Sequence, residues 1–419
     1  MKNKISINQK LLWNIIIVLI NIFVFFGYLI PQRSAFLLVT AFISLIIYIT
    51  LYKKIYKEVI RKNIVWLLIL VFFFIQLLYT INFALSMKFI MTYGAVIIIK
   101  MVFDSISIVM PDYNWKNNFL KTAIFCSGIH VLAKLLYNVF PDFIIAINSK
   151  ILTVTQYSYN KYQHWQGLNP GICDDYGFNA FCNLTFTGLI LCKFFSKKKL
   201  NFIIIACLIC GLLAMAIIGK RGHLVCLILA AIICFFISFK DSSLKKRVGI
   251  IFGVIILATL TYYIISMVPA TSIIIERLNQ SKTVDGLLNG REIIYQHSIE
   301  TFLENPIMGI GIRGVYAKYV MDGHNIYLQI LAETGIIGSF LLFSCFIYYL
   351  IKSFIVHSKC INENTKYIIL FSIFTQLFFL INGITENPFY IESILIFYLI
   401  ITSFCTKEKS NSVLLNNKV

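Results

Sequence analysis

The chain has 419 residues, of which 59% are hydrophobic and 13% charged, and its mean hydropathy is +0.83. Soluble domains use roughly 45–50% apolar and about 25% charged residues, so this composition excludes an ordinary soluble domain. The formal net charge of +19 would suit a nucleic-acid-binding protein only if the basic residues formed a binding surface.

Long apolar stretches cover most of the chain. A helix needs about 20 mostly apolar residues to cross a hydrocarbon core of about 30 Å, and twelve stretches meet this requirement. The sequence therefore predicts an all-α polytopic membrane protein, with a single integral membrane domain over residues 1–419. No small-residue cleavage site follows the first stretch, so we expect an uncleaved span rather than a signal peptide. The predicted spans are 11–30, 35–52, 64–86, 89–110, 118–140, 172–195, 201–219, 222–239, 248–268, 326–351, 366–384 and 389–405.

The lysines and arginines gather on one side of these spans. With the N-terminus in the cytoplasm, and residues at span ends counted with the adjacent side, 24 of the 37 lie inside, 11 outside and 2 within spans. This bias follows the positive-inside rule, so membrane topology explains the charge and no nucleic-acid partner is expected. Twelve spans place both termini in the cytoplasm. We expect a multi-pass protein of the cytoplasmic (inner) membrane, surrounded by the lipid bilayer.

The first long outer loop, residues 141–171, is rich in Tyr, Gln and Asn. Aromatic faces stack on sugar rings and amides pair with hydroxyls, so this composition is typical of sugar recognition. An aromatic belt at the membrane surface has the same composition, and both interpretations remain open. The candidate sugar-binding residues are Tyr157, Tyr159, Tyr162 and Trp165.

A basic pair, Lys220 and Arg221, fills the short outer turn between the seventh and eighth spans. The positive-inside bias disfavours two cations at this position. Arginine presents a planar fork that suits bidentate phosphate binding, although the pair could also simply mark the end of a helical hairpin.

The second long outer loop, residues 269–325, contains a helix with its own start and stop signals and is the expected extracytoplasmic catalytic loop. Asn289 and Glu292 can form a capping box, and Asn305 with the following proline ends the helix. Arg291 opposes the helix macrodipole there, which favours a role in anion binding, with a salt bridge or a solvated surface charge as the alternatives. An apolar stripe is predicted to lie against the bundle or the membrane surface: Ile294, Tyr295, Ser298, Ile299, Phe302 and Leu303.

Three features follow this helix in the stretch NPIMGIGIRGVYAKYVMDGHNIYLQILAETGIIG, residues 305–338. Its glycines allow the backbone to approach a ligand or another helix closely. His324 lies where the loop enters the tenth span, and an imidazole with a reference pKa of about 6.5 can take a proton from a hydroxyl near neutral pH. Glu333 is costly in lipid and should face the bundle or a wet cavity.

The order of these features resembles the O-antigen ligase and Wzy-type polysaccharide polymerase superfamily of bacterial surface glycan assembly. The resemblance rests on Lys-Arg-Gly after the seventh span, an arginine opening the loop helix, NPIMGIGI, and His-Asn followed after nine residues by GIIG. These motifs cover about residues 201–351. The family pattern leads us to expect a serine-like residue before Arg221, and Lys220 departs from that pattern.

This resemblance implies a GT-C-like, metal-independent glycosyltransferase that uses a sugar chain on undecaprenyl diphosphate and needs no cofactor. By motif match, Arg221 and Arg291, with Lys220 beside them, would bind the diphosphate. His324 would be the base that activates the acceptor hydroxyl, so His324 and Arg291 are the expected catalytic residues. Two guanidiniums can stabilise charge on the leaving diphosphate, a task that a divalent metal performs elsewhere.

We expect a polymerase that joins lipid-linked repeat units into a capsule or O-antigen polysaccharide, with other glycan export or chain-length proteins as partners. A ligase that transfers the glycan to a lipid, as in lipopolysaccharide, or to a protein is the alternative, because the His-Asn and GIIG spacing also resembles ligases. A transporter of the same lipid-linked sugars is a second alternative. It would use the mid-span charges Lys100, Asp104 and Lys134, whereas pairing of Asp104 with a lysine is the simpler account.

Overall fold

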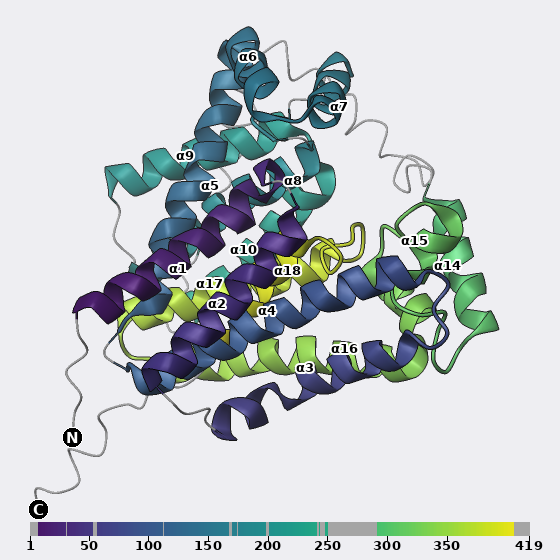
Figure 1. The fold of residues 1–419 in the computed structure, drawn as a ribbon. Helices are drawn as coiled ribbons and strands as arrows, with labels where there is room; N and C mark the ends of the chain where they lie inside the picture. Colours follow the sequence, from purple (N-terminus) through teal and green to yellow (C-terminus); the bar gives the residue numbers. More distant parts are fainter. Residues whose placement is uncertain are drawn as a thin grey trace, which may run out of the picture.

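The computed structural model describes residues 7–405 apart from 31, 53–56, 112, 167–169, 174, 198–200, 241–242, 244–247 and 250–290, and in them it contains helices and no strands. Most helices pack into one bundle, and two smaller pairs, α6–α7 and α14–α15, project from it (Figure 1). The helices are α1 (Ile7–Phe26), α2 (Arg33–Tyr52), α3 (Lys57–Gln76), α4 (Phe83–Val109), α5 (Trp115–Val139), α6 (Pro141–Ile151), α7 (Val154–Trp165), α8 (Tyr176–Lys197), α9 (Phe202–Ile218), α10 (Arg221–Ser238), α14 (Glu292–Glu304), α15 (Gly314–Tyr319), α16 (Ile326–Lys359), α17 (Glu363–Asn382) and α18 (Glu392–Thr402).

The expected all-α, multi-pass membrane class is confirmed. Within the described residues, eight helices are long and apolar enough to cross a membrane, and α9 and the α18 segment are shorter apolar helices. Every predicted span except the ninth corresponds in order to one of the helices. The ninth, 248–268, falls almost entirely outside the described residues, so the total of twelve stays a prediction.

The third predicted span, 64–86, is wrong at its end. Helix α3 ends at Gln76, and the chain turns before α4 begins at Phe83. The side chain of Asn82 caps α4 by accepting a hydrogen bond from the Leu85 backbone nitrogen at 3.1 Å. Apolar residues continue through this turn, so hydropathy alone misses it, whereas a capping residue marks a helix start.

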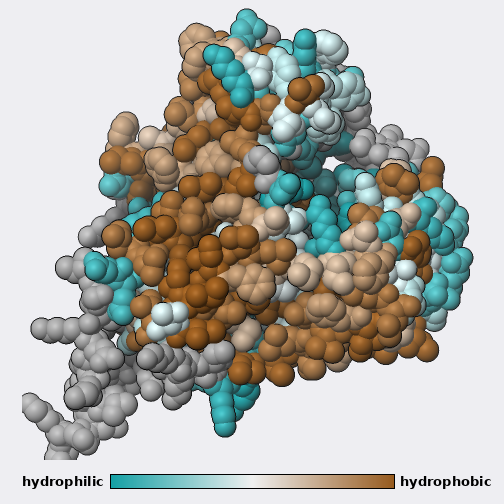
Figure 2. Space-filling view, in the orientation of Figure 1, coloured by the Kyte–Doolittle hydropathy of each residue, from teal (hydrophilic) through white to brown (hydrophobic). Residues whose placement is uncertain are grey.

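Aromatic side chains fill the centre of the bundle, while the outside of α1, α2 and α3 is apolar and exposed. The rings of Phe379 and Tyr398 stack with centroids 4.1 Å apart. In contrast, Ile46 on α2 is 61% exposed and Val71 on α3 is 55% exposed. Figure 2 shows this face as a continuous hydrophobic surface over α1, α2 and α4. Such a surface is stable against lipid tails and costly against water.

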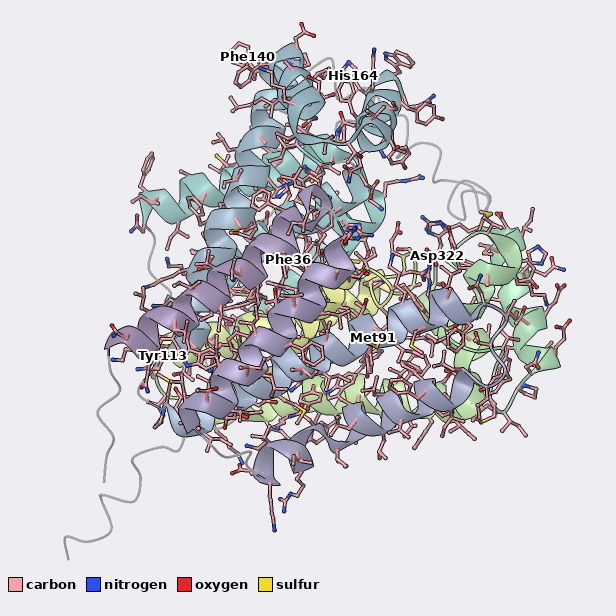
Figure 3. The ribbon with its side chains drawn as sticks, viewed as in Figure 1. Phe36, Met91, Tyr113, Phe140, His164 and Asp322 are labelled. Carbon is pink, nitrogen blue, oxygen red and sulfur yellow. The ribbon has the colours of Figure 1, made fainter. Side chains whose placement is uncertain are left out.

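Successive spans place their ends alternately at two faces of the bundle. At one face, the Tyr28 hydroxyl donates to the Ile172 carbonyl at 2.7 Å, which joins the end of α1 to the segment before α8. At the opposite face, Trp13 Nε1 donates to the Tyr52 hydroxyl at 3.2 Å. We call the first the loop face, because α6, α7, α14 and α15 lie there. In Figure 3, the labelled residues Phe140, His164 and Asp322 mark the loop face and Tyr113 the opposite face.

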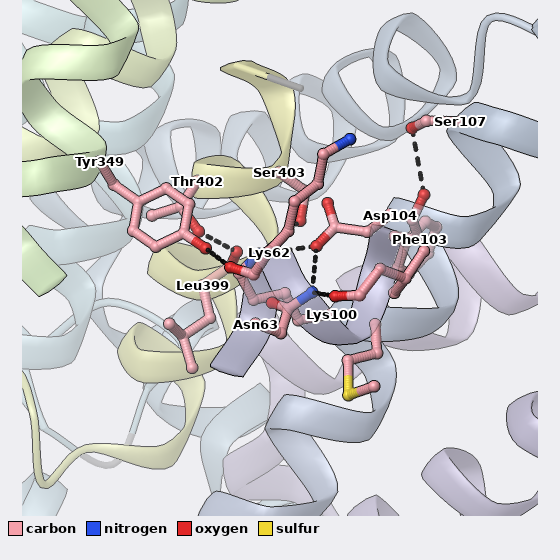
Figure 4. A network of polar contacts seen from close by, with 12 residues as sticks. Lys62, Asn63, Lys100, Phe103, Asp104, Ser107, Tyr349, Leu399, Thr402 and Ser403 are labelled. Carbon is pink, nitrogen blue, oxygen red and sulfur yellow. Dashed lines mark hydrogen bonds and ion pairs between the residues drawn. The ribbon is translucent and has the colours of Figure 1, made fainter. Parts of the chain in front are cut away.

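A buried ion pair lies inside the bundle, toward the face opposite the loop face. Lys100 Nζ is 2.9 Å from Asp104 Oδ2, and both side chains are almost completely buried. Asn63 Nδ2 donates to the same carboxylate oxygen at 2.9 Å, and Lys100 Nζ donates to Ser403 Oγ at 3.3 Å (Figure 4). The predicted pairing of Asp104 with a lysine is confirmed. The pair connects α3, α4 and the segment after α18, so these two charges have structural partners.

Candidate functional site

Helix α16 is interrupted where it meets the loop preceding it. Gly335 has φ 61° and ψ −166°, a backbone conformation open mainly to glycine, and it breaks the helical hydrogen-bond ladder. The freed carbonyls of Ala332 and Glu333 accept hydrogen bonds from the backbone nitrogens of Ile310 and Gly311, at 3.1 and 3.0 Å. In return, the backbone nitrogen of Ile336 donates to the Pro306 carbonyl and that of Ile337 to the Ile307 carbonyl, at 2.9 and 3.3 Å. The segment 306–311 therefore supplies backbone hydrogen-bond partners that the break in α16 removes.

The glycines of the two motifs serve this pairing. A Cβ at Gly309 would clash with the Glu333 carbonyl group, and a Cβ at Gly335 would clash with the Ile307 carbonyl group. Gln76 Nε2 adds hydrogen bonds to the carbonyls of Met308 and Glu333, at 3.0 and 2.9 Å. The close backbone approach predicted for these glycines is thus to another part of the chain itself.

Glu333 faces the protein interior, as predicted. Its carboxylate accepts hydrogen bonds from the backbone nitrogens of Arg313 and Val315, at 2.7 and 3.2 Å, at the start of α15. The Tyr390 hydroxyl donates to it at 2.6 Å, and Gln329 Nε2 donates at 2.9 Å. Glu333 therefore holds the short helix α15 onto α16, and its contacts account for it as a structural residue.

Helix α14 carries the predicted loop helix but starts later than predicted. It begins at Glu292 with Arg291 as its N-cap residue, and no side chain caps it. Asn289, the predicted cap, lies outside the described residues. The helix ends at Asn305, as predicted. Ile294 and Ser298 of the predicted stripe are buried against the loop and α16, whereas Leu303 is 68% exposed.

At the loop face, the carboxylate of Glu386 contacts three basic residues. Its Oε1 atom lies 2.9 Å from Lys220 Nζ and 3.3 Å from an Arg291 guanidinium nitrogen. Its Oε2 atom lies 3.6 Å from His324 Nδ1. The four residues come from the turn before α10, the start of α14, the start of α16 and the segment after α17. Three predicted site residues are therefore brought together, and we call these four residues the Glu386 cluster.

His324 is held in place by its backbone as well as by Glu386. Its φ of 47° lies in the left-handed region, which is unusual for a residue with a side chain. The Tyr295 hydroxyl of α14 donates to the His324 carbonyl at 3.3 Å, and the next residue, Asn325, caps α16. The imidazole remains 40% exposed. With Nδ1 directed to Glu386, the opposite ring nitrogen, Nε2, points away from the carboxylate.

Glu386 is a site residue that sequence reasoning missed. It lies just past the eleventh predicted span, in the stretch Asn-Gly-Ile-Thr-Glu-Asn-Pro at 382–388. Burial raises the pKa of its carboxyl, but the contact with His324 and the charge of Lys220 outweigh burial and hold that pKa well below its usual range. The sequence signal that could have identified Glu386 is its charge, because an acidic residue is unexpected at the loop face, where the expected ligand is itself anionic.

Arg221 follows Lys220 directly and is the first residue of α10, with a partly buried side chain. The adjacent His223 is 2% exposed, on the side of α10 that faces the bundle.

The four aromatic residues predicted to bind sugars all lie on α7, and three of them are exposed. Tyr157 is partly buried against Tyr28 and Leu152. Tyr159 and Tyr162 are 49% and 54% exposed, and Trp165 at the end of the helix is 72% exposed. Helix α7 is tied to the bundle through Gln163, whose Nε2 atom donates to Asp175 at 3.3 Å.

A cavity of about 200 Å³ adjoins the Glu386 cluster. Lys220 and Glu386 line one part of it, and Arg33 and Glu392 line another. Figure 2 shows hydrophilic residues gathered in the hollow between the α6–α7 pair and the α14–α15 pair, bordered by the apolar surface. In the described part of the chain, no three His, Cys, Asp or Glu side chains converge in the manner of metal ligands.

Comparison with protein families gives a match over part of the chain. Residues 205–343 match the family model described as O-antigen ligase. The matched range contains Lys220, Arg221, Arg291 and His324, but it ends before Glu386. The resemblance inferred from the motifs is confirmed over these residues. A search of curated proteins found no match.

Proposed function

Because residues 205–343 match the O-antigen ligase family, we propose that this multi-pass membrane protein is a polysaccharide polymerase. It joins oligosaccharide repeat units carried on undecaprenyl diphosphate into a capsule or O-antigen polysaccharide. The reaction takes place at the loop face, which is the outer face of the cytoplasmic membrane according to the positive-inside bias. The observation that carries the proposal is the convergence of Lys220, Arg291 and His324 on Glu386.

The cations of the Glu386 cluster, together with Arg221, bind the leaving group. The diphosphate of the carrier brings negative charge to Lys220, Arg221 and Arg291, and a guanidinium can bind two phosphate oxygens at once. As the bond between the anomeric carbon and the diphosphate oxygen breaks, the electron pair moves onto the diphosphate. Fixed cations in a partly buried site stabilise this charge without rearrangement of solvent, which makes the reaction metal-independent.

His324 supplies the base. Its Nε2 atom takes the proton from an acceptor hydroxyl as that oxygen attacks the anomeric carbon, and undecaprenyl diphosphate leaves. Glu386 at 3.6 Å from Nδ1 orients the ring and stabilises the imidazolium that forms. The same carboxylate keeps the ammonium of Lys220 and the guanidinium of Arg291 in position before the diphosphate arrives.

A ligase would use the same cluster and differ only in its acceptor, a lipid or a protein. The glycan pattern after loss of the gene separates the two. Loss of a polymerase leaves single repeat units on the carrier or surface, whereas loss of a ligase leaves long chains on the carrier. Long chains on undecaprenyl diphosphate in the deletion strain would replace the polymerase assignment with the ligase.

A further inference from the structure

The cavity beside the Glu386 cluster has buried polar atoms that the protein itself leaves without partners. Within the described part of the chain, His223 Nδ1 and Asn382 Oδ1 are buried and have no hydrogen-bond partner. Both residues line the cavity, and their side chains are 2% and 1% exposed. Buried polar groups are nearly always paired, so two orphans that line one cavity point to a ligand that supplies the missing partners.

The polar lining includes several hydrogen-bond acceptors, and its two cations, Arg33 and Lys220, are already paired with carboxylates. Asn382 Oδ1 can only accept, and the carboxylates of Asp175, Glu386 and Glu392 also accept. Glu392 is held at the cavity by Ser34 Oγ, which donates to it at 2.8 Å. A ligand that matches these acceptors must carry several donors. Sugar hydroxyls are such donors, whereas a phosphate at neutral pH offers mainly acceptors.

The charges of the lining nearly cancel. The cations Lys220 and Arg33 line the cavity with three carboxylates, and each cation already pairs with one of them. Lys220 Nζ lies 2.9 Å from Glu386, and Arg33 Nε lies 3.5 Å from Glu392. The cavity lining therefore carries no excess of positive charge. A neutral ligand fits it better than an anionic one.

Apolar and aromatic side chains complete the walls. The rings of Tyr28 and Phe178 line the cavity and meet edge to face, with centroids 5.9 Å apart. Aromatic faces pack against the C–H face of a pyranose, while the polar groups bind its hydroxyls. The volume of about 200 Å³ corresponds to roughly seven waters at ~30 Å³ each, which suits one monosaccharide unit rather than a longer chain.

We infer that this cavity is a subsite for one neutral pyranose of the acceptor, with Asn382, Glu392 and Asp175 as its hydroxyl-binding residues. The inference rests on the proposed glycosyl transfer. Glu386 both lines the cavity and contacts His324, so a sugar bound in the cavity is separated from the base by this one carboxylate. The exposed aromatic residues of α7 are then not needed for this sugar.

The test is a binding measurement that requires no turnover. Full-length protein carrying His324→Ala is placed in nanodiscs, and saturation-transfer NMR is recorded with methyl glycosides of neutral hexoses, N-acetylhexosamines and a uronic acid. We expect transfer to at least one neutral glycoside. Asn382→Leu should weaken its binding about tenfold through the lost hydroxyl partner. The same variant should not lower Tm, because Asn382 Oδ1 has no protein partner to lose.

Asn21→Leu is the matched control, since Asn21 Oδ1 is also a buried orphan but lies on α1 away from the cavity lining. It should bind the glycoside as well as the parent protein. Absence of transfer to every neutral glycoside, or unchanged binding in Asn382→Leu, would overturn the inference. Displacement of the sugar by inorganic pyrophosphate would also overturn it, because the cavity would then be the phosphate site. None of these results depends on activity, so the proposed transfer reaction would stand or fall separately.

Discussion

Replacement of Glu386 by Gln tests the Glu386 cluster selectively, because Gln keeps the shape of the side chain and removes its charge. Lys220 and Arg291 lie 2.9 and 3.3 Å from Oε1 and retain 17% and 23% side-chain exposure. Removal of one partner of a buried ion pair costs about 3–5 kcal/mol, and the partial exposure here places the loss near about 3 kcal/mol. The measurement is thermal unfolding of the purified protein in nanodiscs, with Glu363→Gln at the exposed start of α17 as the control.

The same substitution should also slow glycan extension by protein that remains folded. A positioned general base contributes about 10²–10⁴-fold to a rate, and Glu386 is the group that orients His324. We expect glycan extension by folded Glu386→Gln protein to fall at least about 100-fold. The assay is extension of a defined lipid-linked repeat at a temperature at which both proteins are folded.

The pH dependence of the stability difference provides a check on the charge. Burial raises the pKa of the Glu386 carboxyl, but His324 and Lys220 lower this pKa by more than burial raises it. The pKa therefore lies below its ordinary value of 4.5. Such a group contributes stability that is fully present above its unfolded pKa and is lost as pH falls through its folded pKa. The Tm difference between wild type and Glu386→Gln should persist down to about pH 5 and shrink below about pH 4. A difference that disappears between pH 8 and 6, or wild-type Tm and activity in the variant, would refute the reasoning.

Three further substitutions extend the account. Arg291→Lys should lose most extension activity, since an ammonium offers a point charge in place of a bidentate fork, and full activity would reduce the role of Arg291 to net charge alone. Gly335→Ala should destabilise the protein by about 2 kcal/mol or more, because φ at this position is 61° and the new Cβ would clash with the Ile307 carbonyl. The control variant Gly94→Ala should be tolerated, because the nearest atom to its new Cβ is 3.7 Å away. Equal melting temperatures for the two variants would contradict the described break in α16. Lys100→Met should cost about 3–5 kcal/mol by leaving Asp104 charged and buried, and the double variant Lys100→Met with Asp104→Leu should regain much of that loss; if the double variant is no more stable than the single one, unpaired charge is not the cause.

The positions of the helices could be predicted because lipid makes hydropathy a direct measure of burial. Of the eleven predicted spans that fall in the described residues, ten correspond closely to helices. The third span, 64–86, is wrong where apolar residues run through the turn capped by Asn82. The helix after Arg291 was predicted from its cap and stop signals, whereas the contact of Arg291 with Glu386 was not. That contact is tertiary and leaves no local pattern.

The candidate site was predictable only in part for the same reason. Lys220 and Arg291 stand out because each opposes a local expectation of charge, and His324 because an imidazole lies where the loop enters a span. Glu386 and Asn382 do not, since their importance comes from what lies beside them in space. The glycines show the opposite case: Gly309 and Gly335 were noted as places of close approach, but only the structure shows that they approach each other's segments.

The central claim is that the Glu386 cluster transfers glycan from a diphosphate carrier with His324 as the base. Its most direct test is reconstitution of the purified protein in liposomes with a defined repeat unit on undecaprenyl diphosphate. Wild-type protein should produce longer glycans and release undecaprenyl diphosphate, and His324→Ala should do neither while it remains folded. Extension by His324→Ala at the wild-type rate, or movement of the lipid-linked sugar across the bilayer by wild type without any extension, would contradict the account.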